Sequence, residues 1–159
     1  MRRSEREVKD FNEIVAILEK CEVLRLALCV NNEPYIVPMN FAHETVDDKL
    51  CIYLHGAKEG KKIDFIRKNP NVCFESDCSY KTITSEEACK WSAEYQSVIG
   101  SGKIYILEDD ADKMHGMDLL MKHYGFQGKP NYPPQMLKAV NVMKIEVSEI
   151  TGKQHILTQ

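Results

Sequence analysis

Two apolar segments joined by a short polar turn constrain the fold more than any other feature of the chain. Residues 23–30 are almost continuously apolar, and residues 35–41 form a second apolar segment after Asn31-Asn32-Glu33-Pro34. Asparagine tolerates the left-handed backbone conformation that tight hairpin turns require. We therefore predict an antiparallel β-hairpin that turns at the two asparagines.

Pro38 restricts where the second strand of this hairpin can lie. Proline has no N–H and cannot donate a hydrogen bond to the ladder of a central strand. The strand should therefore be an edge strand, contain a bulge, or form a wall against which a ligand lies. An ordinary edge strand and a flat ring stacked on Val37-Pro38-Met39-Asn40 fit these residues equally well.

The remaining patterns predict short strands and few helices. The first expected elements are a helix at 5–20 with a capping box at Ser4 and Glu7, strands at 23–30, 35–41 and 50–54, and a short helix that stops at Asn69-Pro70. Strands follow at 71–75 and 95–107, the second with a bulge or bend at Gly100-Ser101-Gly102. The last expected elements are a helix from Asp109 or Asp110 to Gly125, a loop at 125–134, a short helix at 135–139 and a strand at 142–147. Hairpins dominate this order. It favours a mainly β protein, a closed or half-closed antiparallel barrel, over a parallel βαβ sheet.

Composition narrows the class of protein. A chain of 159 residues with 43% hydrophobic residues is expected to form one domain, residues 1–159. A net charge of −3 and a pI near 6.0 argue against nucleic acid as a partner, because no diffuse basic surface is available. No apolar run approaches the roughly 20 residues of a membrane span, and no apolar signal core follows Met1. The expected location is cytoplasmic.

The cysteines and histidines show no metal-binding spacing. Six cysteines form no CxxC pair, and the five histidines form no HExxH pattern, so no metal site is predicted. Cys29, Cys51 and Cys73 lie in apolar strand-like runs and are expected in the core. Cys78 and Cys89 have more polar neighbours and are the better candidates for exposed thiols.

Two lysines stand at the expected start of the helix that follows strand 50–54. Lys61 and Lys62 come directly after Gly60, at a helix end that already carries a partial positive charge. A bound phosphate would make this arrangement favourable, and Gly60 would let the ligand approach the backbone closely. Two lysines that simply point into solvent are the alternative.

Several segments together resemble the nitroimidazole-resistance (Nim-type) branch of the pyridoxamine-phosphate-oxidase-like flavoproteins. They cover nearly the whole chain in the right order: Met1-Arg2-Arg3 with the following charged segment, Tyr35 to Phe41, Tyr53-Leu54-His55 followed by Glu59-Gly60-Lys61-Lys62, Asn69-Pro70 to Glu75, and Tyr95 to Gly102. The resemblance implies an FMN-binding split β-barrel in which FMN lies at the interface of a homodimer.

The resemblance also implies roles for particular residues. Val37, Pro38, Met39 and Asn40 would line the flavin ring and ribityl chain through their backbone, together with Tyr53, Leu54 and His55. Lys62, with Lys61 beside it, would hold the phosphate, and Ser97 would make a polar contact with the flavin. His55 has the position of the family's distinctive histidine, so it is the candidate catalytic residue; it could donate a proton, bind the cofactor or anchor an acceptor. A histidine that only caps the strand is the alternative.

The expected function is that of an FMN-dependent oxidoreductase. By resemblance, the acceptor would be a small electron-poor molecule such as a nitroaromatic or 5-nitroimidazole. The alternative is a non-enzymatic flavin- or haem-binding redox sensor on the same barrel, because a histidine at a pocket rim can also ligate haem iron.

Overall fold

A computed structural model describes residues 3–157 of the chain as a mainly β, antiparallel split barrel. One sheet has the strand order β3-β2-β6-β7-β8-β5-β4, and β1 adds to β8. The strands are β1 (Glu7–Val8), β2 (Leu24–Val30), β3 (Glu33–Met39), β4 (Phe41–Val46), β5 (Lys49–Ala57), β6 (Asn71–Ile83), β7 (Ser92–Ile106) and β8 (Val140–His155). The helices are α1 (Phe11–Leu18), α2 (Lys61–Lys68), α3 (Asp110–His123) and α4 (Pro134–Ala139), with short 3-10 turns at Ser4–Arg6 and Ala88–Lys90.

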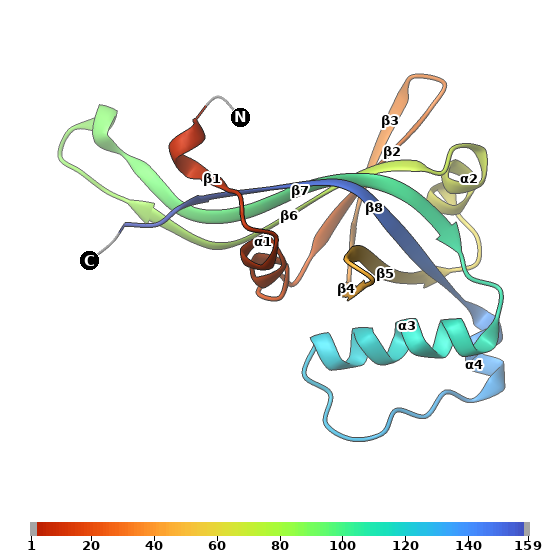
Figure 1. The fold of residues 1–159 in the computed structure, drawn as a ribbon. Helices are drawn as coiled ribbons and strands as arrows, with labels where there is room; N and C mark the ends of the chain where they lie inside the picture. Colours follow the sequence, from red (N-terminus) through yellow and green to blue (C-terminus); the bar gives the residue numbers. More distant parts are fainter. Residues whose placement is uncertain (1–2, 158–159) are drawn as a thin grey trace.

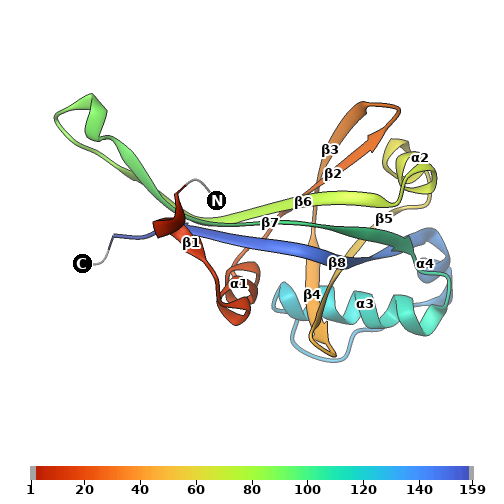
Figure 2. The same ribbon diagram turned by 45° about the horizontal axis from the view of Figure 1, so that its top comes forward.

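The sheet coils around a hydrophobic core, with the long strands β6, β7 and β8 running through the whole molecule (Figures 1 and 2). Large side chains fill the interior completely, among them Leu24, Leu26, Phe41, Ile52, Phe74 and Ile104. Helix α1 packs on β6, β7 and β8, α2 on β2, and α3 on β4, β5 and β8. These contacts place α2 and α3 at opposite sides of strand β5, where the candidate site lies.

The predicted hairpin at the asparagines is confirmed. Asn31 and Asn32 have φ values of 51° and 63°, and Asp47 and Asp48 repeat this geometry between β4 and β5. Both hairpins therefore use the mirror-image turn that matches the right-handed twist of their strands. Strand β3 lies at one end of the sheet order, so Pro38 sits in an edge strand where a missing donor disrupts no central ladder.

The N-terminal helix begins later than predicted, and the capping box at Ser4 is wrong. Asp10 caps α1 instead, because its Oδ1 accepts hydrogen bonds from the amides of Asn12 and Glu13 at 2.9 and 3.1 Å. The preceding Glu7–Val8 pair with β8 as strand β1, and Val8 is buried against Gly152. A tertiary contact has therefore overridden the local capping signal.

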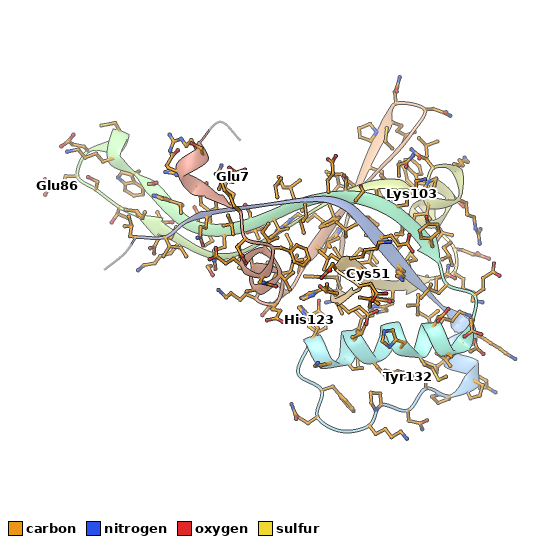
Figure 3. All side chains as sticks on the ribbon, viewed as in Figure 1. Glu7, Cys51, Glu86, Lys103, His123 and Tyr132 are labelled. Carbon is orange, nitrogen blue, oxygen red and sulfur yellow. The ribbon has the colours of Figure 1, made fainter. Side chains whose placement is uncertain are left out.

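Strands β6 and β7 extend well beyond the segments predicted from periodicity. Their ends form a green hairpin that projects away from the barrel, with Glu86 near its tip (Figures 1 and 3). Most residues of this arm are exposed on both faces, so the alternation that marks a half-buried strand is missing there. The expected bulge is present, as a register shift between Ser101 and Gly102.

The cysteines differ in part from expectation. Cys51 is buried and Cys89 is exposed, as predicted, and Cys78 is half-buried. Cys29 and Cys73 are exposed, so their expected place in the core is wrong. Both residues stand at outward-facing positions of β2 and β6. A continuous apolar run predicts burial on both faces of a strand, but at these positions only one face is buried.

Helix α3 begins at the predicted cap and lies close to the sheet. Asp109 caps it, accepting hydrogen bonds from the amides of Ala111 and Asp112, and the chain leaves it at Gly125 with φ 77°. A Cβ at Gly116 would lie 2.8 Å from the Tyr53 ring, so glycine permits the close approach of helix and strand. Within residues 3–157 no helix combines the length and the apolar character needed to cross a membrane.

Candidate cofactor site

The two lysines at the start of α2 have different environments. Lys61 is exposed, and its Nζ donates to Glu33 Oε1 at 2.7 Å. The same ammonium lies 5.1 Å from the ring centre of Tyr35 and 5.3 Å from that of Phe65. The charge of Lys61 is therefore already matched by a carboxylate and two aromatic faces.

Lys62 points its charge toward the end of strands β3 and β5. Its Nζ lies 3.3 Å from Met39 Sδ, a neutral and weak acceptor, and it makes no salt bridge with any residue in the described range 3–157. Burial lowers the pKa of Lys62 below that of an ordinary lysine. A half-buried ammonium without an anionic neighbour is an arrangement that a ligand anion would stabilise.

Two glycines shape the space around this ammonium. A Cβ at Gly56 would lie 2.6 Å from Lys62 Nζ, so any larger residue would displace the ammonium from its place over the end of β5. Gly60 occupies the N-cap of α2 with φ 118° and offers no side chain to the first amides of the helix. The uncapped helix start and Lys62 thus present donors on one side of the strand end.

His55, on β5, has an unsatisfied ring nitrogen. Its Nδ1 is buried and has no hydrogen-bond partner among residues 3–157. Burial, and then the neighbouring positive charge of Lys62, lower the pKa of His55 below its usual value near 6.5. The imidazole is therefore neutral at neutral pH, with one buried nitrogen left without a hydrogen bond.

His55 forms part of the lining of an apolar cavity of about 370 Å³. Its other walls come from α3, from α4 and the segment before it, and from the start of β8: Met117, Asn131, Tyr132, Pro133, Met136, Leu137 and Val140. Tyr132 lies below α3 in this segment (Figure 3). The volume falls within the range of small-molecule sites. The sequence of residues 125–134 predicts only a loop, because no local pattern marks these residues as a cavity wall.

The other predicted residues of β3 and β5 divide between the two faces of the sheet. Leu54 is fully buried in the barrel core, whereas Tyr53 faces α3 and donates to Glu44 Oε1 at 2.6 Å. Met39 is buried beside Lys62, and Val37 packs partly against the core. Pro38 and Asn40 are exposed at the edge. Met39 and Lys62 thus meet at the end of β5 on the face of Leu54 and Gly56, whereas His55 projects from the opposite face, with Tyr53, toward α3.

Ser97 does not lie with these residues within one chain. Ser97 pairs with Lys153 of β8, whereas His55 pairs with Val142 of the same strand. Eleven residues of an extended strand separate these two points on β8, a distance of roughly 35 Å. Ser97 lies where β7 approaches the projecting arm. Across residues 3–157, no group of three or more His, Cys, Asp or Glu side chains is placed to hold a metal ion.

Comparison with known proteins agrees with this architecture. The family model described as pyridoxamine 5'-phosphate oxidase matches residues 10–154. The chain belongs to this family. The structure of a "putative 5-nitroimidazole antibiotic resistance protein" from Bacteroides thetaiotaomicron VPI-5482 is similar, with a TM-score of 0.81 and 30% sequence identity. The match covers 93% of this chain and 86% of that one, which confirms the resemblance seen in the sequence.

Two structures of lower sequence identity share the fold. The flavocytochrome Anf3 from Azotobacter vinelandii aligns with a TM-score of 0.82 at 17% identity, over all of this chain and 75% of that one. An FAD- and haem-binding protein from Mycobacterium smegmatis aligns with a TM-score of 0.79 at 15% identity, over 94% and 73% of the two chains. At these identities the likeness establishes the split barrel and nothing about ligands.

Proposed function

We propose that this chain is an FMN-dependent oxidoreductase that reduces a small electron-poor acceptor such as a 5-nitroimidazole. Two observations at the end of β5 carry the proposal: the Lys62 ammonium makes no salt bridge among the described residues, and His55, whose buried Nδ1 has no partner there, lines an apolar cavity. Membership in the pyridoxamine 5'-phosphate oxidase family and the likeness to the Bacteroides protein support it. The cytoplasmic location expected from the sequence stays a prediction.

The residues at the end of β5 fit the chemical groups of FMN. Lys62 and the uncapped start of α2 would hold the phosphate, and Gly56 leaves room for the chain that leads to it. The backbone of Val37 to Asn40 and of Tyr53 to His55 would face the ring. FMN, when bound, would supply the electrons for reduction of the acceptor.

His55 and the apolar cavity are the acceptor side of the proposal. The cavity walls from α3 and α4 exclude water from a small aromatic ring, and His55 offers one polar contact at the rim. Because the imidazole is neutral at neutral pH, it can donate or accept a hydrogen bond there, and it becomes a proton donor only in more acidic solution.

We propose that two chains form a homodimer that completes the site. Tyr80 and Trp91 on the projecting arm are 69% and 56% exposed, and Ile99 on the outer face of β7 is 52% exposed. Large exposed side chains of this kind mark association surfaces. A second copy could also bring its Ser97 to the flavin, which would account for the distance of Ser97 from Lys62 within one chain.

A comparison of the two neighbouring lysines tests the phosphate site. Lys62→Ala should weaken FMN binding by about 1.5–3 kcal/mol, roughly ten- to a hundred-fold, because a charge-assisted hydrogen bond is lost. Lys61→Ala should change FMN affinity by less than about threefold, because that charge is already paired with Glu33. Fluorescence titration of the apoprotein with FMN measures both constants. Equal losses in the two variants, or none in Lys62→Ala, would place the phosphate elsewhere.

The second candidate is a non-enzymatic flavin- or haem-binding redox sensor. It is favoured by the imidazole of His55 in the lining of the cavity, because imidazole is a ligand type that haem iron uses. Two proteins that share the fold are described as binding haem or as a flavocytochrome. The absorption spectrum of the purified protein distinguishes flavin from haem. Bleaching by a pyridine nucleotide, with recovery when a nitroimidazole is added, supports the enzyme; a haem spectrum or no recovery supports the sensor.

A further inference from the structure

Two cysteines that are distant in the sequence meet beneath helix α1. Cys21 follows the end of α1, and Cys78 lies on β6 where the strand begins its irregular pairing with β7. The sulfur atoms of both residues contact the same carbonyl oxygen, that of Ile17, at 3.2 Å from Cys21 and 3.9 Å from Cys78. Neither cysteine belongs to the site at the end of β5.

The two thiols differ in access to solvent. Cys21 is 1% exposed, whereas Cys78 is half-buried and opens onto a surface cleft of about 360 Å³ that Lys20 and Arg25 also line. Ser79 Oγ lies 3.7 Å from Cys78 Sγ as a hydrogen-bond donor, and Ser79 itself has φ 60°, an unusual conformation for a residue other than glycine. A small oxidant can therefore reach Cys78 first, with Cys21 directly behind it.

We propose that Cys21 and Cys78 form a redox-active dithiol that is oxidised to an intramolecular disulfide by a hydroperoxide. The Cys78 thiolate attacks one peroxide oxygen, the O–O bond breaks, and Cys78 becomes a sulfenic acid. The Cys21 sulfur then attacks the Cys78 sulfur, the S–O bond breaks, and the Cys21 proton leaves with the hydroxyl group as water. Overall, two thiols lose two protons and two electrons, and hydrogen peroxide becomes two molecules of water.

The environment of Cys21 determines which thiol meets the oxidant. Burial, and in smaller part the adjacent Cys78 thiol, raise the pKa of Cys21 to about 12. Cys21 therefore stays a protonated thiol with little reactivity toward an oxidant in solution, and its proton has to leave as its sulfur attacks the Cys78 sulfenic acid. Three other cysteines are exposed: Cys29, Cys73 and Cys89. The contacts described for them include no second cysteine.

Peptide mapping of the wild-type protein tests the proposal directly. The reduced protein is treated with equimolar hydrogen peroxide, remaining thiols are blocked with N-ethylmaleimide, and the digest is analysed by mass spectrometry. The expected product is a peptide pair joined through Cys21 and Cys78, which dithiothreitol separates. The proposal is contradicted if Cys21 is recovered fully blocked as a free thiol, if Cys78 is recovered as a sulfinic acid, or if the exposed cysteines form disulfides between chains.

The melting temperature provides a second readout. Because the bond joins residues 21 and 78, it restricts the unfolded chain, and peroxide treatment should raise the melting temperature by about 5 °C or more. Cys78→Ala should lose this shift, whereas Cys89→Ala, which removes an exposed thiol on the arm, should keep it. A shift that survives in Cys78→Ala would contradict the assignment.

Discussion

At the scale of single residues, the protonation of His55 determines how it can serve a reaction. Burial and the charge of Lys62 lower its pKa, so His55 takes up a proton only below the usual value near 6.5. The unfolded chain binds that proton more readily. The folded protein should therefore lose stability as the pH falls from about 6.5 through the lowered pKa of His55. Above about pH 6.5 the neutral imidazole should keep its full contribution to stability.

The same titration gives a prediction for turnover. If His55 donates a proton to the acceptor, nitroimidazole reduction by the FMN-loaded protein should rise as the pH falls below 6.5 toward the lowered pKa. His55→Ala should retain FMN and lose about tenfold or more in rate, with a flat profile over this interval. Steady-state rates at matched FMN content, with circular dichroism as a check on folding, measure this. Identical profiles in both proteins would limit His55 to positioning.

At the scale of elements, the end of α3 is attached to the rest of the fold by two side chains. The hydroxyl of Tyr124 donates to the carbonyl oxygen of Glu22 at 2.6 Å and accepts from the amide of Phe41 at 3.1 Å. His123 Nε2 lies 2.8 Å from the carbonyl oxygen of Cys21, at the end of α3 nearest α1 (Figure 3). Since α3 carries Met117, these bonds also hold one wall of the cavity in place.

Removal of the Tyr124 hydroxyl tests this attachment. Tyr124→Phe should lower the free energy of unfolding by about 1–2 kcal/mol, because it leaves a main-chain donor of a buried residue unpaired. Tyr105→Phe is the matched control, since the Tyr105 hydroxyl has no side-chain hydrogen bond to another described residue. Urea unfolding measures both variants. A cost in Tyr105→Phe equal to that in Tyr124→Phe would show that the Tyr124 bonds add no stability.

At the scale of the whole molecule, the projecting arm and the proposed flavin site, which Ser97 cannot reach within one chain, predict an obligate dimer. Sedimentation equilibrium should give twice the 18.3 kDa mass of one chain at all accessible concentrations. A permanent homodimer of this kind is expected to bury more than roughly 2,000 Å². Replacing Tyr80 and Trp91 by serine should shift the equilibrium toward the monomer. A wild-type monomer that still holds FMN tightly would contradict the dimeric site.

Features written in adjacent residues could be predicted from the sequence, because short-range backbone chemistry determines them. The asparagine turn, the bulge near Gly100 and the Asp109 cap all depend on which φ angles and donors a few neighbouring residues allow. The two lysines after Gly60 and the segments that resemble the family are also patterns of adjacent residues. They were enough to predict the split barrel.

Only the tertiary structure decided features that depend on residues far apart in the chain. Lys61 has a salt bridge because Glu33 of strand β3 reaches it, whereas Lys62 has none among the described residues. Strand β1 displaced the expected capping box because β8 offered it a partner. Cys21 and Cys78 meet only because β6 packs against α1. Burial and pairing of this kind arise from the summed packing of distant segments, which no local pattern of residues records.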